Sequence, residues 1–289
     1  MRYLFPIINS TGTSLSKLSQ KGGLIGKVLT NLDFYLPFRQ HAPSLKNARH
    51  EIYADLNSQD CKDGVAFFNI LAFRGVFFGS PFAKSDHFQW FKSYEHWKAF
   101  QKEEKQEALD VCGVEEKYYV MKNCYGQSQI KRSTELLEKY WQQRKSWNEI
   151  FGQSTPPTVD KVYNWLMSRE EGASKFHNIG SLSAFLICGD LIEANLVPMP
   201  SSYEVGKFIY KLGMGGKKGM EELDLVNEGD YNGEDFCKAF ASLDAYVEKT
   251  LGMEEKKAMG YNVVMLEHTL CKIKRLTALK EFKNIFTQI

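Results

Sequence analysis

The sequence lacks the cysteine patterns that build metal sites and disulfide frameworks. Its six cysteines are scattered, with no Cys-x-x-Cys pair and no Cys/His ligand spacing: Cys61, Cys112, Cys124, Cys188, Cys237 and Cys271. Several of them stand among apolar residues, as Cys188 does, which is typical of buried free thiols in a reducing compartment. We therefore expect no structural zinc, no metal in the active site and no cofactor.

Excess charge and membrane-spanning runs are also absent. The formal net charge is only +2, so binding to nucleic acid would need a local basic face rather than an overall polycation. The first residues lack the charged-then-apolar pattern of a secretion signal. The most apolar stretch, 64–82, contains Asn69 and Arg74 and ends in Gly-Ser-Pro. This predicts a buried core helix, in a soluble cytoplasmic protein with no membrane partner.

Strand signals are sparse, and apolar residues recur with helical spacing between Gly, Pro, Ser and Asn breaks. We expect helices near 27–40, 44–57, 63–78, 85–110, 133–150, 158–169, 174–196, 202–212, 216–227, 232–251 and 260–284. The segment 113–130 stays ambiguous between strand and helix. The fold class is mainly α. Residues 1–26 are expected to be an N-terminal arm, and residues 27–289 a single helical unit of two packed lobes.

Residues 158–196 resemble a helix-hairpin-helix, in which a short turn joins two helices. The turn reads Phe176-His177-Asn178-Ile179-Gly180, and Ser181 opens an apolar helix. Backbone N–H groups at such a turn and at the following helix N-terminus can bind a DNA phosphate without reading the sequence. The candidate DNA-binding residues are Asn178, Ile179, Gly180 and Ser181. Many helical hairpins only pack, however, and the sequence leaves this alternative open.

A glycine- and lysine-rich segment follows at 213–219. Its four glycines permit close backbone approach to a ligand, and its two lysines add positive charge. We therefore add Gly215, Gly216, Lys217 and Lys218 to the candidate DNA contacts. The spacing excludes a P-loop. A flexible basic loop is the alternative.

Three polar residues occupy apolar helices. Asp190 is either a helix-face residue or an acid aimed into a cleft. Asn69 and Arg74 share one apolar helix, where a buried amide and guanidinium must find partners. A polar substrate base is one such partner, and for Arg74 a structural salt bridge to an Asp or Glu is the other.

These segments together resemble the alpha-glutamyl/putrescinyl thymine pyrophosphorylase family over about residues 45–276. The motifs that carry the resemblance, in chain order, are Arg49-x-Glu51-Ile52-Tyr53, Phe67-Phe68-Asn69-Ile70-Leu71-x-Phe73-Arg74, Ile179-Gly180 with Ala184-Phe185 and Asp190-Leu191, Gly213-x-Gly215-Gly216-Lys217-Lys218-Gly219, and Leu270-Cys271-Lys272. The family is related in fold to helix-hairpin-helix DNA glycosylases. Its members are associated with hypermodified pyrimidines in phage DNA, either by exchanging groups at the 5-substituent or by removing modified bases as an antiviral defence.

The sequence departs from these patterns in three places. Met214 and Gly216 replace the Pro and Ala of the family's glycine loop, and Asn178 stands where glycosylases commonly have Gly. The usual position of the glycosylase aspartate falls near 200–204, where the sequence offers Glu204. The candidate catalytic acid is therefore Asp190, with Glu51 and Glu204 as reserves.

The resemblance implies a monofunctional DNA glycosylase that flips a modified pyrimidine, such as a glucosylated hydroxymethyl pyrimidine, out of phage DNA and leaves an abasic site. Its candidate substrate-binding residues are Asn69, Arg74, Phe68 and Glu51. Two alternatives stay open: a transferase or pyrophosphorylase acting on the 5-substituent of a thymine, and a non-catalytic reader of modified DNA. An ion at the hairpin and the oligomeric state also stay open.

Overall fold

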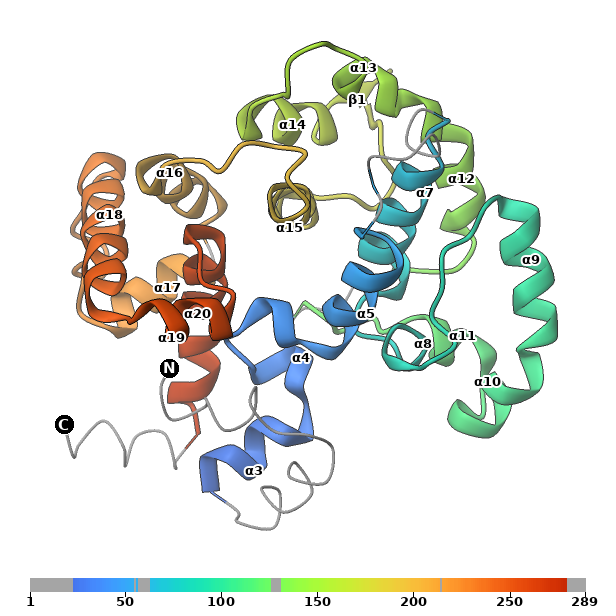
Figure 1. Ribbon diagram of the computed structural model, residues 1–289, viewed down its shortest axis with the longest axis horizontal. Coiled ribbons are helices and arrows are strands. Elements are labelled where there is room, and N and C mark those ends of the chain that lie inside the picture. The colour runs from blue at the N-terminus through green and yellow to red at the C-terminus, as the bar shows by residue number, and fades with distance from the viewer. Residues whose placement is uncertain (1–22, 55, 57–62, 126–130, 214, 280–289) are drawn as a thin grey trace. The chain divides into compact units, whose positions relative to one another are not determined.

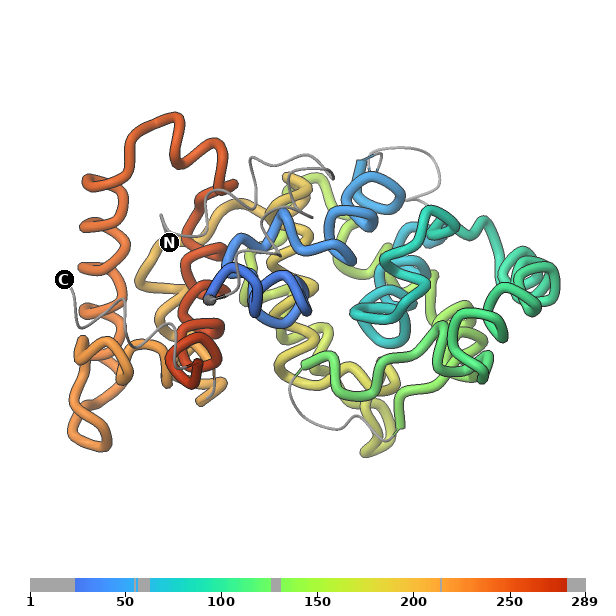
Figure 2. Tube along the Cα trace, turned by 90° about the horizontal axis from the view of Figure 1, so that it is seen from below, coloured from blue at the N-terminus to red at the C-terminus, as the bar shows by residue number. Residues whose placement is uncertain are grey.

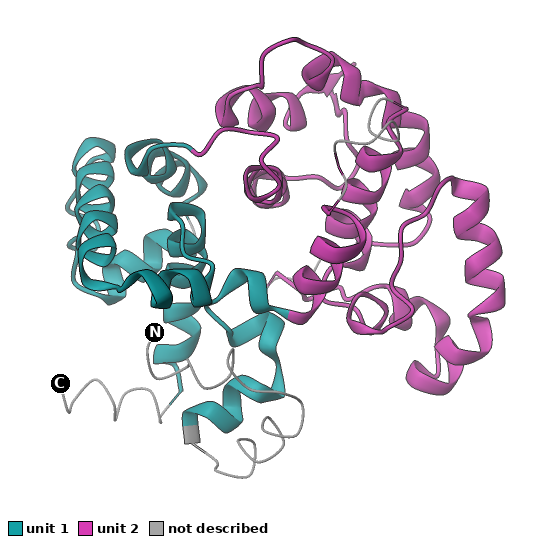
Figure 3. Cartoon of the chain, in the orientation of Figure 1, with its two compact units in different colours: residues 1–42, 200–289 teal, residues 43–199 magenta. Residues whose placement is uncertain are grey.

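The computed structural model describes residues 23–54, 56, 63–125, 131–213 and 215–279 (Figure 1). It confirms a mainly helical chain. The described part holds a single sheet, in which strand β1 (Arg169–Glu170) pairs antiparallel with β2 (Ala173–Ser174). The chain divides into two compact units (Figure 3): unit 1 comprises residues 1–42 and 200–289, and unit 2 comprises residues 43–199.

Unit 2 is built from one continuous stretch of chain. Its elements are α5 (Pro43–Glu51), α7 (Val65–Ala72), the π-helix η3 (Phe73–Phe77), α8 (Pro81–Lys84), α9 (Tyr94–Glu103), α10 (Lys105–Cys112), α11 (Glu115–Tyr119), α12 (Leu136–Gln143), η4 (Arg144–Ser146), α13 (Trp147–Phe151), α14 (Val159–Leu166), β1, β2 and α15 (Ser181–Glu193). The segment 113–130, which the sequence left ambiguous, contains the short helix α11.

Residues 65–77 of the apolar stretch 64–82 form a buried core helix, as the composition predicts, and the stretch then turns into the separate short helix α8. Every residue of α7 after Val65 is buried, and the helix continues into η3. In η3 the Phe78 N–H donates to the Phe73 carbonyl at 2.7 Å, the i→i+5 bond of a π-turn. This wider turn carries Arg74.

Among the described residues, no helix is long and apolar enough to cross a membrane.

Aromatic side chains fill much of the interior of unit 2. Phe82 lies within ring-contact distance of many others, and those aromatic neighbours are Phe77, Phe88, Phe91, Trp97, Phe100, Tyr118 and Tyr119. A second group places Phe67 against Trp147, Trp165 and Phe176. The high aromatic content is therefore used largely for packing, because large rings bury much apolar area per residue.

Unit 1 joins the two ends of the described chain. It contains α3 (Gly23–Thr30), α4 (Leu32–Tyr35), η2 (Arg39–His41), α16 (Ser202–Leu212), α17 (Gly216–Glu222), α18 (Gly233–Thr250), α19 (Met253–Met259) and α20 (Val263–Thr277). Helix α16 packs on α18, and α17 packs on α20 (Figures 1 and 2). One apolar cluster combines residues from both stretches: Leu24, Val28, Leu36, Phe38, Met259, Met265 and Leu276.

Glycine permits the close contact of α17 with α20. A Cβ at Gly219 would overlap the backbone carbonyl of Leu270, and a Cβ at Gly215 would overlap the Cys271 sulfur. Gly215 also has φ +53°, a backbone conformation that other residues rarely adopt. The glycines of 213–219 thus have a packing role.

Several expected helix boundaries are wrong. The expected helix 85–110 begins only at Tyr94, after the Ser93 cap, and α10 follows it as a separate helix. The expected helix 174–196 begins only at Ser181, because β2 and a turn occupy the preceding residues. The expected helix 260–284 begins at Val263, after the Asn262 cap.

The expected N-terminal arm, residues 1–26, contains the start of a helix. Helix α3 occupies residues 23–26 of the expected arm, while residues 1–22 lie outside the described residues. Helix α16 spans 202–212 as the sequence predicts, and Ser201 and Glu204 form the capping box at its start.

Candidate active site

Asp190 and Arg74 form a buried ion pair in unit 2. Arg74 donates from Nε to Asp190 Oδ2 at 2.6 Å and from Nη2 to Oδ1 at 2.5 Å. The Tyr53 hydroxyl donates to the same Oδ2 at 2.8 Å. Both charged residues lie in apolar segments, Asp190 in α15 and Arg74 in η3, and each is at most 2% exposed. The sequence left two partners open for Arg74, a substrate base and a structural salt bridge. The structure contains the salt bridge.

The surroundings of Arg74 keep its side chain charged. Burial by itself would lower the pKa of Arg74, but the charge of Asp190 and the hydrogen bonds to it raise that pKa above its ordinary value. The guanidinium also lies 5.0 Å from the Phe73 ring centre and 4.7 Å from that of Phe78. Two forked hydrogen bonds and two rings therefore restrict Arg74 to one orientation.

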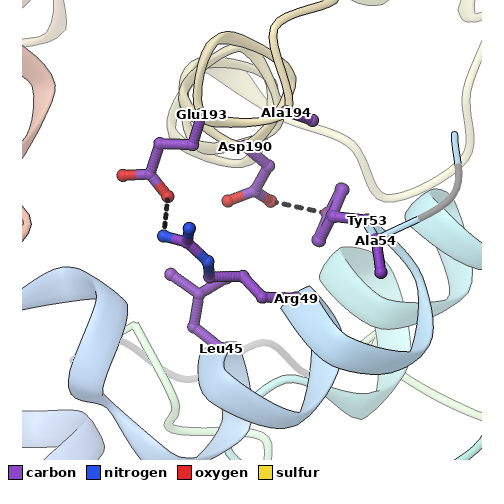
Figure 4. A pocket seen from close by; sticks show the side chains of 7 residues that line it. All are labelled: Leu45, Arg49, Tyr53, Ala54, Asp190, Glu193 and Ala194. Atoms are coloured by element: carbon purple, nitrogen blue, oxygen red, sulfur yellow. Dashed lines mark hydrogen bonds and ion pairs between the residues drawn. The ribbon is translucent and has the colours of Figure 1, made fainter.

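A small pocket of about 120 Å³ opens beside this ion pair. Helix α5 and the residues that follow it contribute one side, helix α15 and Ala194 the other (Figure 4). The residues that line the pocket are Leu45, Arg49, Tyr53, Ala54, Asp190, Glu193 and Ala194. Two carboxylates and one guanidinium thus face a single cavity.

Helical periodicity explains why these residues meet. Leu45 and Arg49 are four residues apart on α5, and Asp190 and Glu193 are three apart on α15, so each pair shares a helix face. Glu193 Oε2 lies 3.5 Å from Arg49 Nη1. The Glu193 side chain is 4% exposed and that of Arg49 is 37% exposed, so Arg49 is the charged group at the solvent side of the pocket.

Asn69 and Phe68, predicted to bind the substrate, make contacts within the core of unit 2. Asn69 donates to the Phe91 carbonyl at 2.8 Å and accepts from the Phe91 N–H at 2.9 Å. Its amide also donates to the Val65 carbonyl at 2.9 Å. Phe68 is buried against Trp141, with ring centres 5.3 Å apart. Neither residue lines the pocket, and these contacts account for both without a ligand.

The two reserve acids lie elsewhere. Glu51, at the end of α5, has its Oε1 2.6 Å from His50 Nδ1 and is not among the residues that line the pocket. Glu204 accepts the Ser201 N–H at 2.7 Å, and this backbone hydrogen bond lowers the pKa of Glu204. Glu204 therefore caps α16. Of the three candidate acids, only Asp190 reaches the pocket.

The turn before α15 is partly exposed and partly anchored in the core. Asn178 has φ +57°, and Gly180 and Ser181 are exposed at the start of the thirteen-residue helix α15. Ile179 is buried and anchors the turn in the core. The connection from α14 to α15 runs through residues 167–180 and includes the β1–β2 hairpin, so it is longer than the short turn that the sequence predicts.

The lysines of 213–219 have partners within unit 1. Lys217 lies 5.0 Å from the Tyr210 ring centre and 5.1 Å from that of Tyr231. Lys218 pairs with Glu221 at 2.7 Å and with Glu228 at 2.8 Å. Together with the packing role of Gly215 and Gly216, these contacts explain the segment without DNA. The DNA-binding role of these four residues stays a prediction, and Met214 lies outside the described residues.

Sequence reasoning missed Glu193 as a site residue, and it used Arg49 and Tyr53 only as parts of a motif. The signal for Glu193 was present, since it follows Asp190 by one helical turn. The signal for Tyr53 was weak, because its position depends on the turn after α5.

No group of three or more His, Cys, Asp or Glu side chains that could hold a metal ion occurs in the described part of the chain.

Comparison of the whole chain with protein-family models, with curated proteins and with solved structures finds no significant match.

Proposed function

We propose that the chain is a DNA glycosylase that excises a modified pyrimidine and that the pocket of unit 2 is its active site. The observation that carries the proposal is the placement of two carboxylates, Asp190 and Glu193, beside Arg49 and Tyr53 in one small pocket. Cleavage of an N-glycosidic bond develops positive charge on the sugar, and a preorganised carboxylate stabilises that charge. The motif resemblance to the thymine pyrophosphorylase family supports the choice of a base in DNA as substrate.

The two carboxylates have different roles in this proposal. Arg74 and Tyr53 hold Asp190 in one orientation, so it is the rigid carboxylate placed near the sugar C1′. Glu193, one helical turn away, orients the attacking water. No lysine is among the described residues that line the pocket, which favours hydrolysis over the imine chemistry of glycosylases that also cut the backbone.

The size of the pocket limits what enters it. Pockets that enclose drug-sized ligands measure roughly 300–1,000 Å³, whereas this one measures about 120 Å³. It therefore receives one small group, such as the edge of the flipped nucleoside that carries the scissile bond. A bulky 5-substituent lies outside, towards Arg49, which is the more exposed of the two charged residues in the Glu193–Arg49 pair.

The turn 178–181 supplies the contact with the strand. Gly180 and Ser181 are exposed at the start of α15, the same helix that carries both carboxylates. A phosphate bound there is favoured by the helix dipole and by the backbone N–H groups. Rotation of the base out of the duplex costs a few kcal/mol, which such phosphate contacts offset.

The test is incubation of the purified protein with phage DNA that carries modified or unmodified pyrimidines, with abasic sites scored by aldehyde labelling. Glu193→Gln is the main variant, because it keeps the side-chain volume and leaves the Arg74–Asp190 pair intact. Glu107→Gln, an exposed carboxylate on α10, is the matched control. We expect abasic sites only in modified DNA, a loss of at least about a hundredfold in Glu193→Gln and no change in the control.

Other outcomes reassign or reject the proposal. Intact DNA with altered base masses would identify a transferase that acts on the 5-substituent. Salt-sensitive binding without any change in the bases would identify a reader of modified DNA. Full activity in Glu193→Gln would remove this carboxylate from the mechanism.

A further inference from the structure

A second cavity in unit 2, larger than the first, has no role in the proposed base excision. It measures about 430 Å³, within the range of pockets that bind small molecules. The residues that line it are Asp63, Val65, Trp141, Arg144, Lys145 and Asn148. Asp63 precedes α7 and Val65 is its first residue, while the others come from α12, η4 and α13. None of them lines the pocket that holds Asp190.

The cavity combines a flat surface with positive charge. The Arg144 guanidinium carbon lies 3.9 Å from the Trp141 ring centre, so the guanidinium stacks on the indole. Lys145, the next residue, is exposed, and Asp63 supplies one opposing carboxylate. Two cations and one anion leave a net charge of about +1 on the lining, by simple count of side chains. An anionic ligand with a flat ring matches this lining.

Contacts outside the cavity hold this surface in place. Trp141 packs edge to face on the buried ring of Phe68, with ring centres 5.3 Å apart. Arg144 Nη1 donates to the Trp141 carbonyl at 2.7 Å. Gly64 has φ +75°, and a Cβ there would overlap the Arg144 carbonyl, so α7 and η4 can approach only with glycine at this position. The stack is therefore preorganised, which lowers the entropy cost of binding a ring.

We propose that this cavity binds a nucleotide, with the base stacked on the Trp141–Arg144 surface and the phosphate placed against Arg144 and Lys145. Arginine planes and aromatic rings are the surfaces on which proteins stack single bases. Arginine also binds phosphate through two N–H groups. The Asp63 carboxylate and the Asn148 amide are polar groups able to bond base or sugar edges. The nucleotide comes either from the free pool or from a single DNA strand, and both present the same chemistry.

Isothermal titration calorimetry on the full chain tests the assignment. The probes are thymidine 5′-monophosphate, thymidine, inorganic phosphate and a five-nucleotide oligothymidylate. Arg144→Ala and Lys145→Ala remove one cation each, and Lys139→Ala, an exposed lysine of α12 that does not line the cavity, is the matched control. Circular dichroism confirms that each variant is folded.

We expect the monophosphate to bind at least about tenfold more tightly than thymidine or phosphate alone, because stacking and charge act together. We expect Arg144→Ala to weaken binding about tenfold or more and Lys139→Ala to leave it unchanged. Tighter binding of the oligonucleotide than of the monophosphate assigns the site to a DNA strand, and equal binding assigns it to free nucleotide. Absence of saturable binding, or binding that Arg144→Ala does not weaken, overturns the proposal. The result is independent of base excision, since Glu193 is not among the residues of this cavity.

Discussion

Removal of the Asp190 carboxylate should destabilise unit 2 strongly. In Asp190→Ala the Arg74 guanidinium, 1% exposed, keeps its charge and loses the carboxylate that accepts two of its hydrogen bonds. Breaking a buried ion pair at one partner costs about 3–5 kcal/mol. A domain is typically stable by only about 5–15 kcal/mol. The expected loss is therefore a large part of the total stability, and a loss of activity in this variant would not by itself show that Asp190 is catalytic.

The double variant Arg74→Met/Asp190→Leu separates charge from packing. It removes both charges and fills the space with apolar side chains, and such replacements are often neutral or stabilising. We expect its free energy of unfolding to lie within about 1–2 kcal/mol of the wild type. The two positions would then show a coupling energy of several kcal/mol in a double-mutant cycle, above the usual range of about 0.5–3 kcal/mol for residues in contact.

Urea unfolding followed by tryptophan fluorescence is the appropriate assay, because every tryptophan of the chain lies in unit 2: Trp90, Trp97, Trp141, Trp147 and Trp165. Asp86→Ala, which removes an exposed carboxylate of the same unit, is the control and should change stability by less than about 0.5 kcal/mol. The reasoning is refuted if Asp190→Ala costs less than about 1 kcal/mol, or if the double variant is as unstable as the sum of the single ones.

Three further predictions concern other parts of the chain. Gly219→Ala should destabilise unit 1 by about 1–3 kcal/mol in urea unfolding followed by circular dichroism, because the added methyl group meets the Leu270 backbone carbonyl. Asn69→Ala should cost about 2–4 kcal/mol by tryptophan fluorescence, because the Phe91 N–H and carbonyl both lose their buried partner. The free energy of unfolding of unit 1 should increase as the pH rises, because burial lowers the pKa of Lys272 from 10.5 to about 7. Between these values the unfolded chain binds the proton and the folded chain releases it, so the wild type should gain about 1.5 kcal/mol relative to Lys272→Met from pH 7 to pH 8.5.

Each of these has a result that contradicts it. A Gly219→Ala protein as stable as the wild type would mean that α17 and α20 move apart at little cost. An Asn69→Ala loss below about 0.5 kcal/mol would mean that water replaces the amide. A constant difference between Lys272→Met and the wild type across the pH range would mean that the amine titrates alike in the folded and unfolded chain.

Much of the fold could be predicted from periodicity, but the partners of the polar residues could not. The helical class and the buried helix at 65–77 follow from local pattern, since composition and spacing are visible in the sequence. The break before Tyr94 was missed, because Phe88 and Phe91 pack against Phe77 from a non-helical segment. The break before Ser181 was missed, because a two-residue strand pair precedes it.

In the candidate site, too, the need for a partner could be predicted from the sequence, but the identity of that partner could not. That a buried Asp190 needs a cation is a local argument, yet the choice of Arg74, more than a hundred residues away in the chain, depends on how η3 packs on α15. Glu193 was predictable from its spacing to Asp190. Asn69 was correctly expected to need partners, but its partners are backbone groups of Phe91, which no periodicity indicates.

Unit 1 is formed by two stretches of chain that are separated by unit 2, so its core cannot be completed until the second stretch has been synthesised. Unit 2 leaves the ribosome complete, whereas the first stretch of unit 1 carries Leu24, Val28, Leu36 and Phe38, whose apolar partners Met259, Met265 and Leu276 come last. At roughly 5–20 residues per second, the chain from Pro200 to Leu276 takes about 4–15 s to appear. For that interval Leu24, Val28, Leu36 and Phe38 lack the apolar partners that bury them in the folded unit.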